Sequence, residues 1–290
     1  MDRLDARATG RLEARVPSAR RRRGPAVTTQ PVLLEVTERI ATVTLNRPEA
    51  RNALSSEVLR LLPQLMREAD TREDVDVVIL TGADPAFCAG LDLKELGSSA
   101  GNLRPAGNAD REAPPPTARG PFPDMEKPVI GAINGPAITG GFEIALNCDF
   151  LVASERARFG DTHTRVGVMP GWGLTVLLQQ AIGVRRAKEM SVTGNFLDAR
   201  EALTWGLVNH VVAHDELLPF CRRLAVDIIG NDQRGVRQIS RTYDAVAGAT
   251  VAEGWEIERR DSREWQRQGF DPAEVERRRL AIIERGRAQT

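Results

Sequence analysis

From residue 32 onward, short runs of β-branched and aliphatic residues alternate with helical patterns. No other feature of the sequence restricts the possible folds as much as this alternation. Residues 32–36 (VLLEV) and 40–45 (IATVTL) flank a short polar segment, which predicts a β-hairpin. Ser55 can cap the helix that follows, and residues 75–82 (VDVVILTG) predict a buried strand that ends at a glycine. The apolar residues on one face of that helix are Val58, Leu61, Leu62, Leu65 and Met66. The pattern predicts an α/β fold with both faces of the sheet covered.

Three segments depart from this alternation. Residues 1–30 are rich in arginine and lack apolar periodicity, which favours a disordered tail or sequence upstream of the functional start. A nucleic-acid-binding arm and an organelle transit peptide stay open as alternatives, although the acidic residues there argue against the second. Residues 97–123 are rich in proline and glycine, which predicts a mobile surface excursion. The chain beyond residue 212 has only amphipathic helical patterns, at 215–229, 234–248, 251–267 and 272–286. These helices are expected to form a separate layer or an oligomerisation element.

Composition excludes several classes of function. The 40 basic and 40 acidic residues cancel, so net charge indicates neither nucleic acid nor membrane as the main partner. No apolar run approaches the ~20 residues of a membrane-spanning helix, and no secretory signal is evident. Three widely spaced cysteines match no disulfide framework, which favours a reduced, cytoplasmic compartment. Three scattered histidines do not form a metal-ligand set.

Two glycine-containing stretches are candidates for chemistry. Residues 87–96 (FCAGLDLKEL) form a loop that enters a short helix, and residues 133–149 (INGPAITGGFEIALNCD) lead from a strand into a helix. Glycines at such turns let the backbone approach a ligand and leave N–H groups at the helix start unpaired. Tight packing of the turn is the alternative for either stretch alone. Neither stretch matches a nucleotide-binding glycine motif.

Five stretches in order resemble the crotonase (enoyl-CoA hydratase/isomerase) superfamily. They are NRPEARNALS (46–55), ILTGADPAFCAGLDLKEL (79–96), KPVIGAINGPAITGGFEIALNCD (127–149), ARFGDTHTRVGVMPGWG (157–173) and TGNFLDAREALTWGLVN (193–209). The resemblance runs from about residue 31 to the C-terminus. It implies a spiral of ββα units over residues 31–208, then a C-terminal all-helical oligomerisation region over 209–290. It also implies a homotrimer or hexamer.

The resemblance implies an enzyme that acts on acyl-CoA thioesters, with coenzyme A as part of the substrate and no other cofactor. By motif position, the backbone N–H groups of Leu91 and Gly140 would form an oxyanion hole for the thioester oxygen. Ala89 lies in the same motif and is expected at the substrate. Lys94 and Arg51 resemble positions near the CoA phosphates, and a solvated surface charge is the alternative for each.

A family hydratase uses two glutamates, one to activate water and one to manage the proton at the α-carbon. Glu143 matches the first, whereas His163 stands at the position of the second. Imidazole can exchange a proton near neutral pH but lacks the charge and the two acceptor oxygens of a carboxylate. If residues 161–165 are extended, Asp161 and Arg165 face the same side as His163. Asp161 would then orient His163 or substitute for the missing carboxylate, and a pairing of His163 with Glu143 would raise the pKa of the histidine.

Several assignments stay open. Trp172 follows a Met-Pro-Gly turn and is expected either to wall an acyl pocket or to pack in the core. His210 and His214 lie away from every motif and are expected to be structural. The leading interpretation is an enoyl-CoA hydratase-like lyase. An enoyl-CoA isomerase or another single-glutamate reaction is the first alternative, and a non-catalytic acyl-CoA-binding protein is the second.

Overall fold

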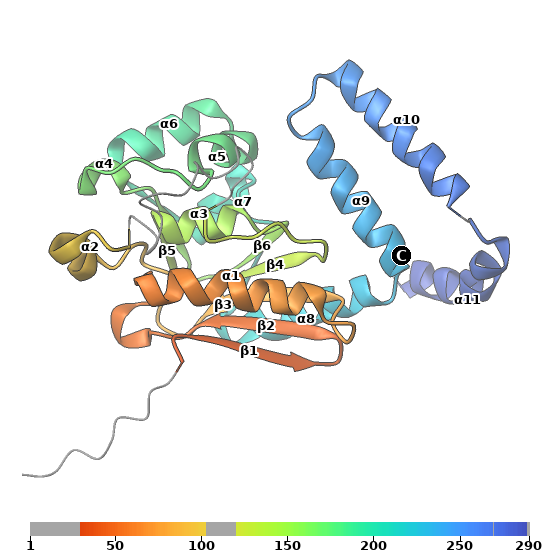
Figure 1. Cartoon of the computed structure of the whole chain (residues 1–290), viewed down its shortest axis with the longest axis horizontal. Coiled ribbons are helices and arrows are strands. Elements are labelled where there is room, and N and C mark those ends of the chain that lie inside the picture. The colour runs from red at the N-terminus through yellow and green to blue at the C-terminus, as the bar shows by residue number, and fades with distance from the viewer. Residues whose placement is uncertain (1–29, 103–119, 269, 289–290) are drawn as a thin grey trace, which may run out of the picture.

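The computed structural model describes residues 30–102, 120–268 and 270–288 (Figure 1). A six-stranded sheet has the order β1-β2-β3-β4-β6-β9. Its strands are β1 (Val32–Thr37), β2 (Ile40–Leu45), β3 (Val77–Gly82), β4 (Val129–Ile133), β6 (Phe150–Ser154) and β9 (His210–Val212). Within this sheet the β1–β2 pairing is antiparallel and the other four pairings are parallel. A three-stranded sheet contains β5 (Pro136–Ile138), β7 (Arg158–Gly160) and β8 (Phe196–Asp198).

The expected hairpin is confirmed at the edge of the large sheet. Thr37 pairs with Ile40, and the intervening Glu38 and Arg39 both have positive φ angles of 53° and 65°. Two residues in this conformation form the kind of turn whose twist matches that of the flanking strands. The central strands β3 and β4 are buried along their whole length, as expected for parallel strands covered on both faces.

One helix covers each face of the large sheet. Helix α1 (Ser56–Thr71) begins at Ser55, whose hydroxyl accepts the N–H of Val58, as the sequence predicts. Helix α8 (Leu217–Ile229) packs on the opposite face. The side chains that α8 buries there are Leu217, Cys221 and Ala225. Since β9 and α8 belong to the sheet and its cover, the core extends past the boundary expected at residue 208.

Among the described residues, six short helices follow α1 along the chain. They are α2 (Leu93–Ser99), α3 (Gly140–Leu146), α4 (His163–Val166), α5 (Leu174–Ile182), α6 (Val184–Thr193) and α7 (Ala199–Trp205), with 3-10 turns at Pro48–Ala50 and His214–Glu216. Helices α3 and α7 contact the small sheet. Alternation of these helices with the strands confirms the α/β class. Helix α3 and the segment that leads into α4 meet beside β5 and β7, because β5 pairs directly with β7.

The three last helices extend to one side of the sheet (Figure 1). They are α9 (Gln233–Val246), α10 (Val251–Arg267) and α11 (Pro272–Ala288), close to the expected ranges. Helices α9 and α10 contact each other, and none of the three buries a residue fully. Large apolar side chains stay exposed there, namely Ile239, Tyr243, Val251, Trp255, Phe270, Val275, Leu280, Ile282 and Ile283. The single chain therefore leaves an apolar surface uncovered along this arm.

The two compositionally unusual segments fall mostly outside the described residues. Of the arginine-rich segment, only Gln30 is described. Residues 97–102 complete α2 and its C-terminal turn, and Asn102 and Phe122 are both buried. The two ends of the segment at residues 97–123 are therefore packed on the core and are not mobile as expected. Its middle, residues 103–119, lies outside the described residues. Among the described residues, no helix combines the length and the apolar character that crossing a bilayer requires.

Candidate active site

The first glycine-containing loop packs directly on the start of α3. Cys88 donates its N–H to the carbonyl of Pro136 at 3.0 Å, and its own carbonyl accepts the N–H of Ile138 at 2.9 Å. Gly90 has a φ of 86°, and a Cβ there would lie 2.8 Å from the carbonyl oxygen of Ile138 and 3.5 Å from the nitrogen of Gly140. The turn therefore needs glycine, and it brings the backbone of residues 90–91 beside the first turn of α3.

The two expected oxyanion donors keep unused N–H groups at this junction. Leu54 donates to the carbonyl of Gly90 at 2.8 Å and accepts from Asp92 at 3.1 Å, so the N–H of Leu91 points away from that pairing. Gly140 is the first residue of α3 and has no side-chain cap. Neither N–H donates a hydrogen bond to another described residue. Adjacent backbone donors without partners can bind a polarised oxygen.

Glu143 lies one turn into α3 with its carboxylate buried at 2% exposure. Its Oε1 accepts the backbone N–H of Trp172 at 2.7 Å and that of Leu174 at 3.3 Å. Its Oε2 lies 3.4 Å from Nε2 of His163. One carboxylate oxygen is therefore fixed by the backbone, and the other faces the histidine.

His163 is 5% exposed and lies between two carboxylates. Its Nδ1 contacts Oδ1 of Asp161 at 2.6 Å, on the side of the ring opposite to Glu143. Burial alone would lower the pKa of His163, but hydrogen bonds and charge interactions with Asp161 and Glu143 outweigh it and raise the pKa to about 9. The histidine is therefore an imidazolium at neutral pH, with both ring N–H groups directed at carboxylates.

Asp161 is buried beside His163, on the side of the ring opposite to Glu143. Burial opposes its charge, yet hydrogen bonds from His163 and Ser191 hold the pKa of Asp161 below its ordinary value. Its Oδ1 also accepts the backbone N–H of His163 at 3.1 Å, so one carboxylate fixes both the backbone and the ring. Asp161 contacts the far nitrogen of the imidazole, which is the position of an orienting group and not that of a second carboxylate facing Glu143.

The expectation of an extended segment over residues 161–165 is wrong. The carbonyl of Thr162 accepts N–H groups from Arg165 and Val166, which closes the short helix α4. Because the chain turns at Thr162, Arg165 is exposed and points to Phe196, with its guanidinium 5.8 Å from the ring centre. Asp161 still meets His163, through a local contact and not through a shared strand face.

Trp172 is half-buried and lies over the start of α3. A Cβ on Gly140 would lie 2.8 Å from Cζ3 of the indole, so the ring covers the residue that would supply the second donor. The Trp172 carbonyl accepts the side-chain amide of Asn147 at 2.9 Å, and that amide also donates to the carbonyl of Glu143 at 2.8 Å. The indole packs at the edge of the core cluster, so it has a position compatible with both expected roles.

Of the remaining predicted substrate residues, Ala89 and Arg51 lie on loops and Lys94 lies in the first turn of α2. Ala89 is half-buried and donates its N–H to the carbonyl of Arg51 at 3.0 Å. The side chains of Arg51 and Lys94 are exposed, and neither forms an ion pair within the described part of the chain. Both side chains are therefore accessible to solvent.

Two contacts near the site were not expected from the sequence. Thr139, just before the two glycines of α3, has a positive φ of 52° and contacts Thr162 through its hydroxyl. No local sequence pattern indicates this conformation, because contacts with Gly160 and Thr162 hold it. His214 contacts the Ser154 hydroxyl at 3.0 Å and the Asp84 carboxylate at 2.9 Å, and so links β6 to the loop after β3. Because Asp84 belongs to the motif at residues 79–96, His214 does contact a motif segment, contrary to expectation.

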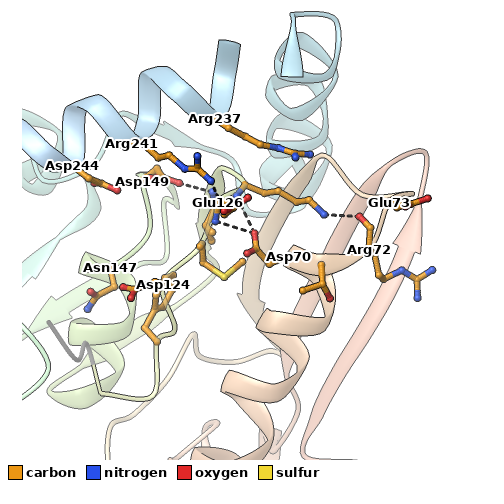
Figure 2. Close-up of a pocket in the computed structure, with 15 residues that line it drawn as sticks. Asp70, Arg72, Glu73, Asp124, Glu126, Asn147, Asp149, Arg237, Arg241 and Asp244 are labelled. Carbon is orange, nitrogen blue, oxygen red and sulfur yellow. Dashed lines mark hydrogen bonds and ion pairs between the residues drawn. The ribbon is translucent and has the colours of Figure 1, made fainter. Parts of the chain in front are cut away.

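A separate cleft of about 970 Å³ lies between α9 and the core (Figure 2), and Glu143 is not among the residues that line it. Several of its charged groups have partners among the described residues. Asp70 accepts two backbone N–H groups at 3.0 Å, Lys127 donates to two carbonyls, and Arg241 pairs with Glu126. The pair of Arg241 and Glu126 connects α9 to the segment before β4. No group of histidines, cysteines and carboxylates among the described residues has the arrangement of a metal site.

Comparison with known proteins identifies the relatives of this chain. One relative is the "Probable enoyl-CoA hydratase 1, peroxisomal" of Arabidopsis thaliana. It is 42% identical over 200 residues, which cover 69% of this chain and 73% of that protein. The short-chain-enoyl-CoA hydratase of Clostridium acetobutylicum is 39% identical, covering 69% of this chain and 76% of that protein. A crystal structure of enoyl-CoA hydratase from Mycobacterium smegmatis is 48% identical with a TM-score of 0.67, covering 83% of this chain and all of that one. The profile of the family described as Enoyl-CoA hydratase/isomerase matches residues 35–284. The chain therefore belongs to the enoyl-CoA hydratase/isomerase family and has the crotonase fold.

Proposed function

We propose that this protein hydrates the α,β-double bond of enoyl-CoA thioesters with a carboxylate–imidazolium pair in place of two glutamates. The observation that supports this most directly is the buried contact of 3.4 Å between Glu143 and His163, beside the unused N–H groups of Leu91 and Gly140. Hydration needs a base and an acid on one side of the substrate, and a site that stabilises charge on the thioester oxygen. These four groups supply both requirements.

The charge states assign the roles of the two side chains. Glu143 Oε2 takes a proton from water as the water oxygen bonds to the β-carbon, and the π electrons shift onto the thioester oxygen. The N–H groups of Leu91 and Gly140 stabilise this enolate, and each such donor is commonly worth ~3–4 kcal/mol. Nε2 of His163, protonated because its pKa is about 9, delivers its proton to the α-carbon.

The direct contact between the two side chains closes the cycle. After addition, Glu143 holds a proton and His163 has lost one, so transfer from Oε2 to Nε2 across 3.4 Å restores the starting state. Asp161 favours this return because its charge stabilises the imidazolium. In this pair Oε2 of Glu143 already contacts the imidazolium, so water must compete for that oxygen, and hydration is expected to be slow for a member of this family.

We also propose substrate contacts for three residues near the site, namely Trp172, Arg51 and Lys94. Trp172 covers Gly140 and is proposed to bound the acyl side of the site. Arg51, on the loop that contacts Ala89, and Lys94, in the first turn of α2, are both exposed and are proposed to bind the CoA phosphates. The uncovered apolar surface of α9–α11 supports assembly into a trimer or hexamer, since a stable interface would bury it.

The proposal is tested by incubating the purified protein with crotonyl-CoA and following the enoyl absorbance and the mass gain of one water. Glu143→Gln keeps the shape of the side chain and removes the base, so it should lose hydration while still binding butyryl-CoA, measured by calorimetry. Butyryl-CoA binding by the unaltered protein without any hydration would support a non-catalytic acyl-CoA-binding protein. Migration of the double bond of 3-enoyl-CoA without hydration would support an isomerase.

A further inference from the structure

Thr139 has a backbone conformation that suits glycine better than threonine. It lies between β5 and α3 with φ 52° and ψ −115°, and it is 8% exposed. Branching at Cβ makes a positive φ especially unfavourable, and such strained residues persist only where their surroundings hold them. The neighbouring structure must therefore fix this residue.

Three hydrogen bonds hold Thr139, and together they join the two halves of the candidate site. Its N–H donates to the carbonyl of Gly160 at 2.8 Å, at the end of β7. Its carbonyl accepts the N–H of Glu143 at 2.9 Å, which closes the first turn of α3. Its hydroxyl contacts the hydroxyl of Thr162, the residue that precedes His163.

Only the hydroxyl contact depends on the type of side chain at position 139. Thr162 begins α4 and makes no side-chain cap to that helix, so its hydroxyl remains available to Thr139. The contact ties the residue before Gly140 to the residue before His163. Glycine would adopt the backbone conformation with less strain but could not make this link.

We infer that Thr139 is a positioning residue that holds His163 opposite Glu143 and directs the N–H of Gly140. The inference rests on the proposed function for its effect on rate. Without the hydroxyl link, α4 can shift relative to α3, and the contact of 3.4 Å between the two acid–base groups lengthens. Both proton transfers and the raised pKa of His163 depend on that contact.

Three substitutions separate the hydroxyl from the backbone strain. Thr139→Val keeps the branched shape and removes the hydroxyl, Thr139→Ser keeps the hydroxyl, and Thr139→Gly removes both the hydroxyl and the strain. For crotonyl-CoA we expect Val and Gly to lower kcat at least tenfold with KM changed less than threefold, and Ser to stay within threefold of the unaltered protein. Thr164→Val is the matched control, because it removes an exposed threonine hydroxyl on α4 that bonds only the Ser191 carbonyl.

A second readout does not require turnover. The pKa of His163, measured by NMR, should fall in Thr139→Val and recover in Thr139→Ser, whereas a purely structural role would change only the melting temperature. Thr139→Gly should melt no lower than Thr139→Val, because its backbone strain is relieved. A Thr139→Val protein with unaltered kcat and an unaltered His163 pKa would overturn the inference, as would equal impairment of the Ser and Val variants. Absence of hydration in every protein, with the pKa pattern as expected, would instead refute the proposed function alone.

Discussion

Replacement of Asp161 by asparagine tests the charge state on which the proposed chemistry depends. Asp161→Asn keeps the size of the side chain and removes the charge at 2.6 Å from Nδ1 of His163. The difference between the ordinary histidine pKa of 6.5 and the value of about 9 in the folded protein corresponds to ~3 kcal/mol in favour of the imidazolium. Since Asp161 makes the shorter of the two carboxylate contacts, we expect its neutralisation to lower the pKa of His163 by at least about one unit, or ~1.4 kcal/mol.

The direction of the pH dependence follows from the raised pKa. The folded protein binds this proton more tightly than the unfolded chain, so the stabilisation is fully present below pH 6.5 and is lost as pH rises toward 9. The free energy of unfolding of the unaltered protein should therefore decline over this range more steeply than that of Asp161→Asn. Urea titrations at pH 6, 7.5 and 9 measure the difference.

NMR of the imidazole Cε1–H groups gives the pKa directly, because the sequence has only three histidines and a His163→Gln spectrum assigns the signal. A His163 signal that titrates near 6.5 in the unaltered protein would refute the reasoning. A pKa that is the same with and without the Asp161 charge would also refute it.

Three further outcomes follow from the structure. Gly140→Pro removes the N–H of Gly140 and should abolish turnover of crotonyl-CoA. Leu91→Ala keeps the N–H of residue 91 and should retain acyl-CoA binding. Full activity of Gly140→Pro would contradict the oxyanion assignment. Trp172→Ala should raise kcat/KM for dodecenoyl-CoA relative to crotonyl-CoA at least tenfold, and an unchanged ratio would remove Trp172 from the acyl site. Trp205→Ala is the control, because Trp205 ends α7 and packs against the same core cluster. Sedimentation at micromolar concentration should show a trimer or hexamer, and a stable monomer would contradict burial of the apolar arm.

Local patterns predicted much of the fold because they depend on neighbouring residues. The hairpin of β1 and β2, the start of α1 at Ser55 and the ranges of α9–α11 follow from side-chain alternation, capping and helical period. The packing of α8 could not be predicted in this way. Its amphipathic pattern indicates a buried face, but only the long-range fold decides that this face covers the large sheet and not a partner.

The candidate site was likewise predictable only in part. Motif position indicated Glu143 and His163, and the structure brings them together. Asp161 was predicted from an extended segment that is in fact helical, yet it contacts His163 locally. The helical turn at Thr162 was missed because it consists of two backbone hydrogen bonds in a four-residue helix, too short for periodicity to reveal. The strained conformation of Thr139 was missed because it is imposed by contacts with Gly160 and Thr162, more than twenty residues away in the chain.

The rate of crotonyl-CoA hydration after substitution of His163 tests the central claim most directly. If Glu143 is the base and His163 the acid, His163→Ala should lose activity by about 10²-fold or more, the range typical of a general acid. His163→Glu restores a carboxyl group that can donate a proton, and it should hydrate crotonyl-CoA at or above the rate of the unaltered protein. Butyryl-CoA binding by each variant confirms that the substrate site is intact. A His163→Ala protein that hydrates crotonyl-CoA as fast as the unaltered one would contradict the account and leave His163 as a structural residue.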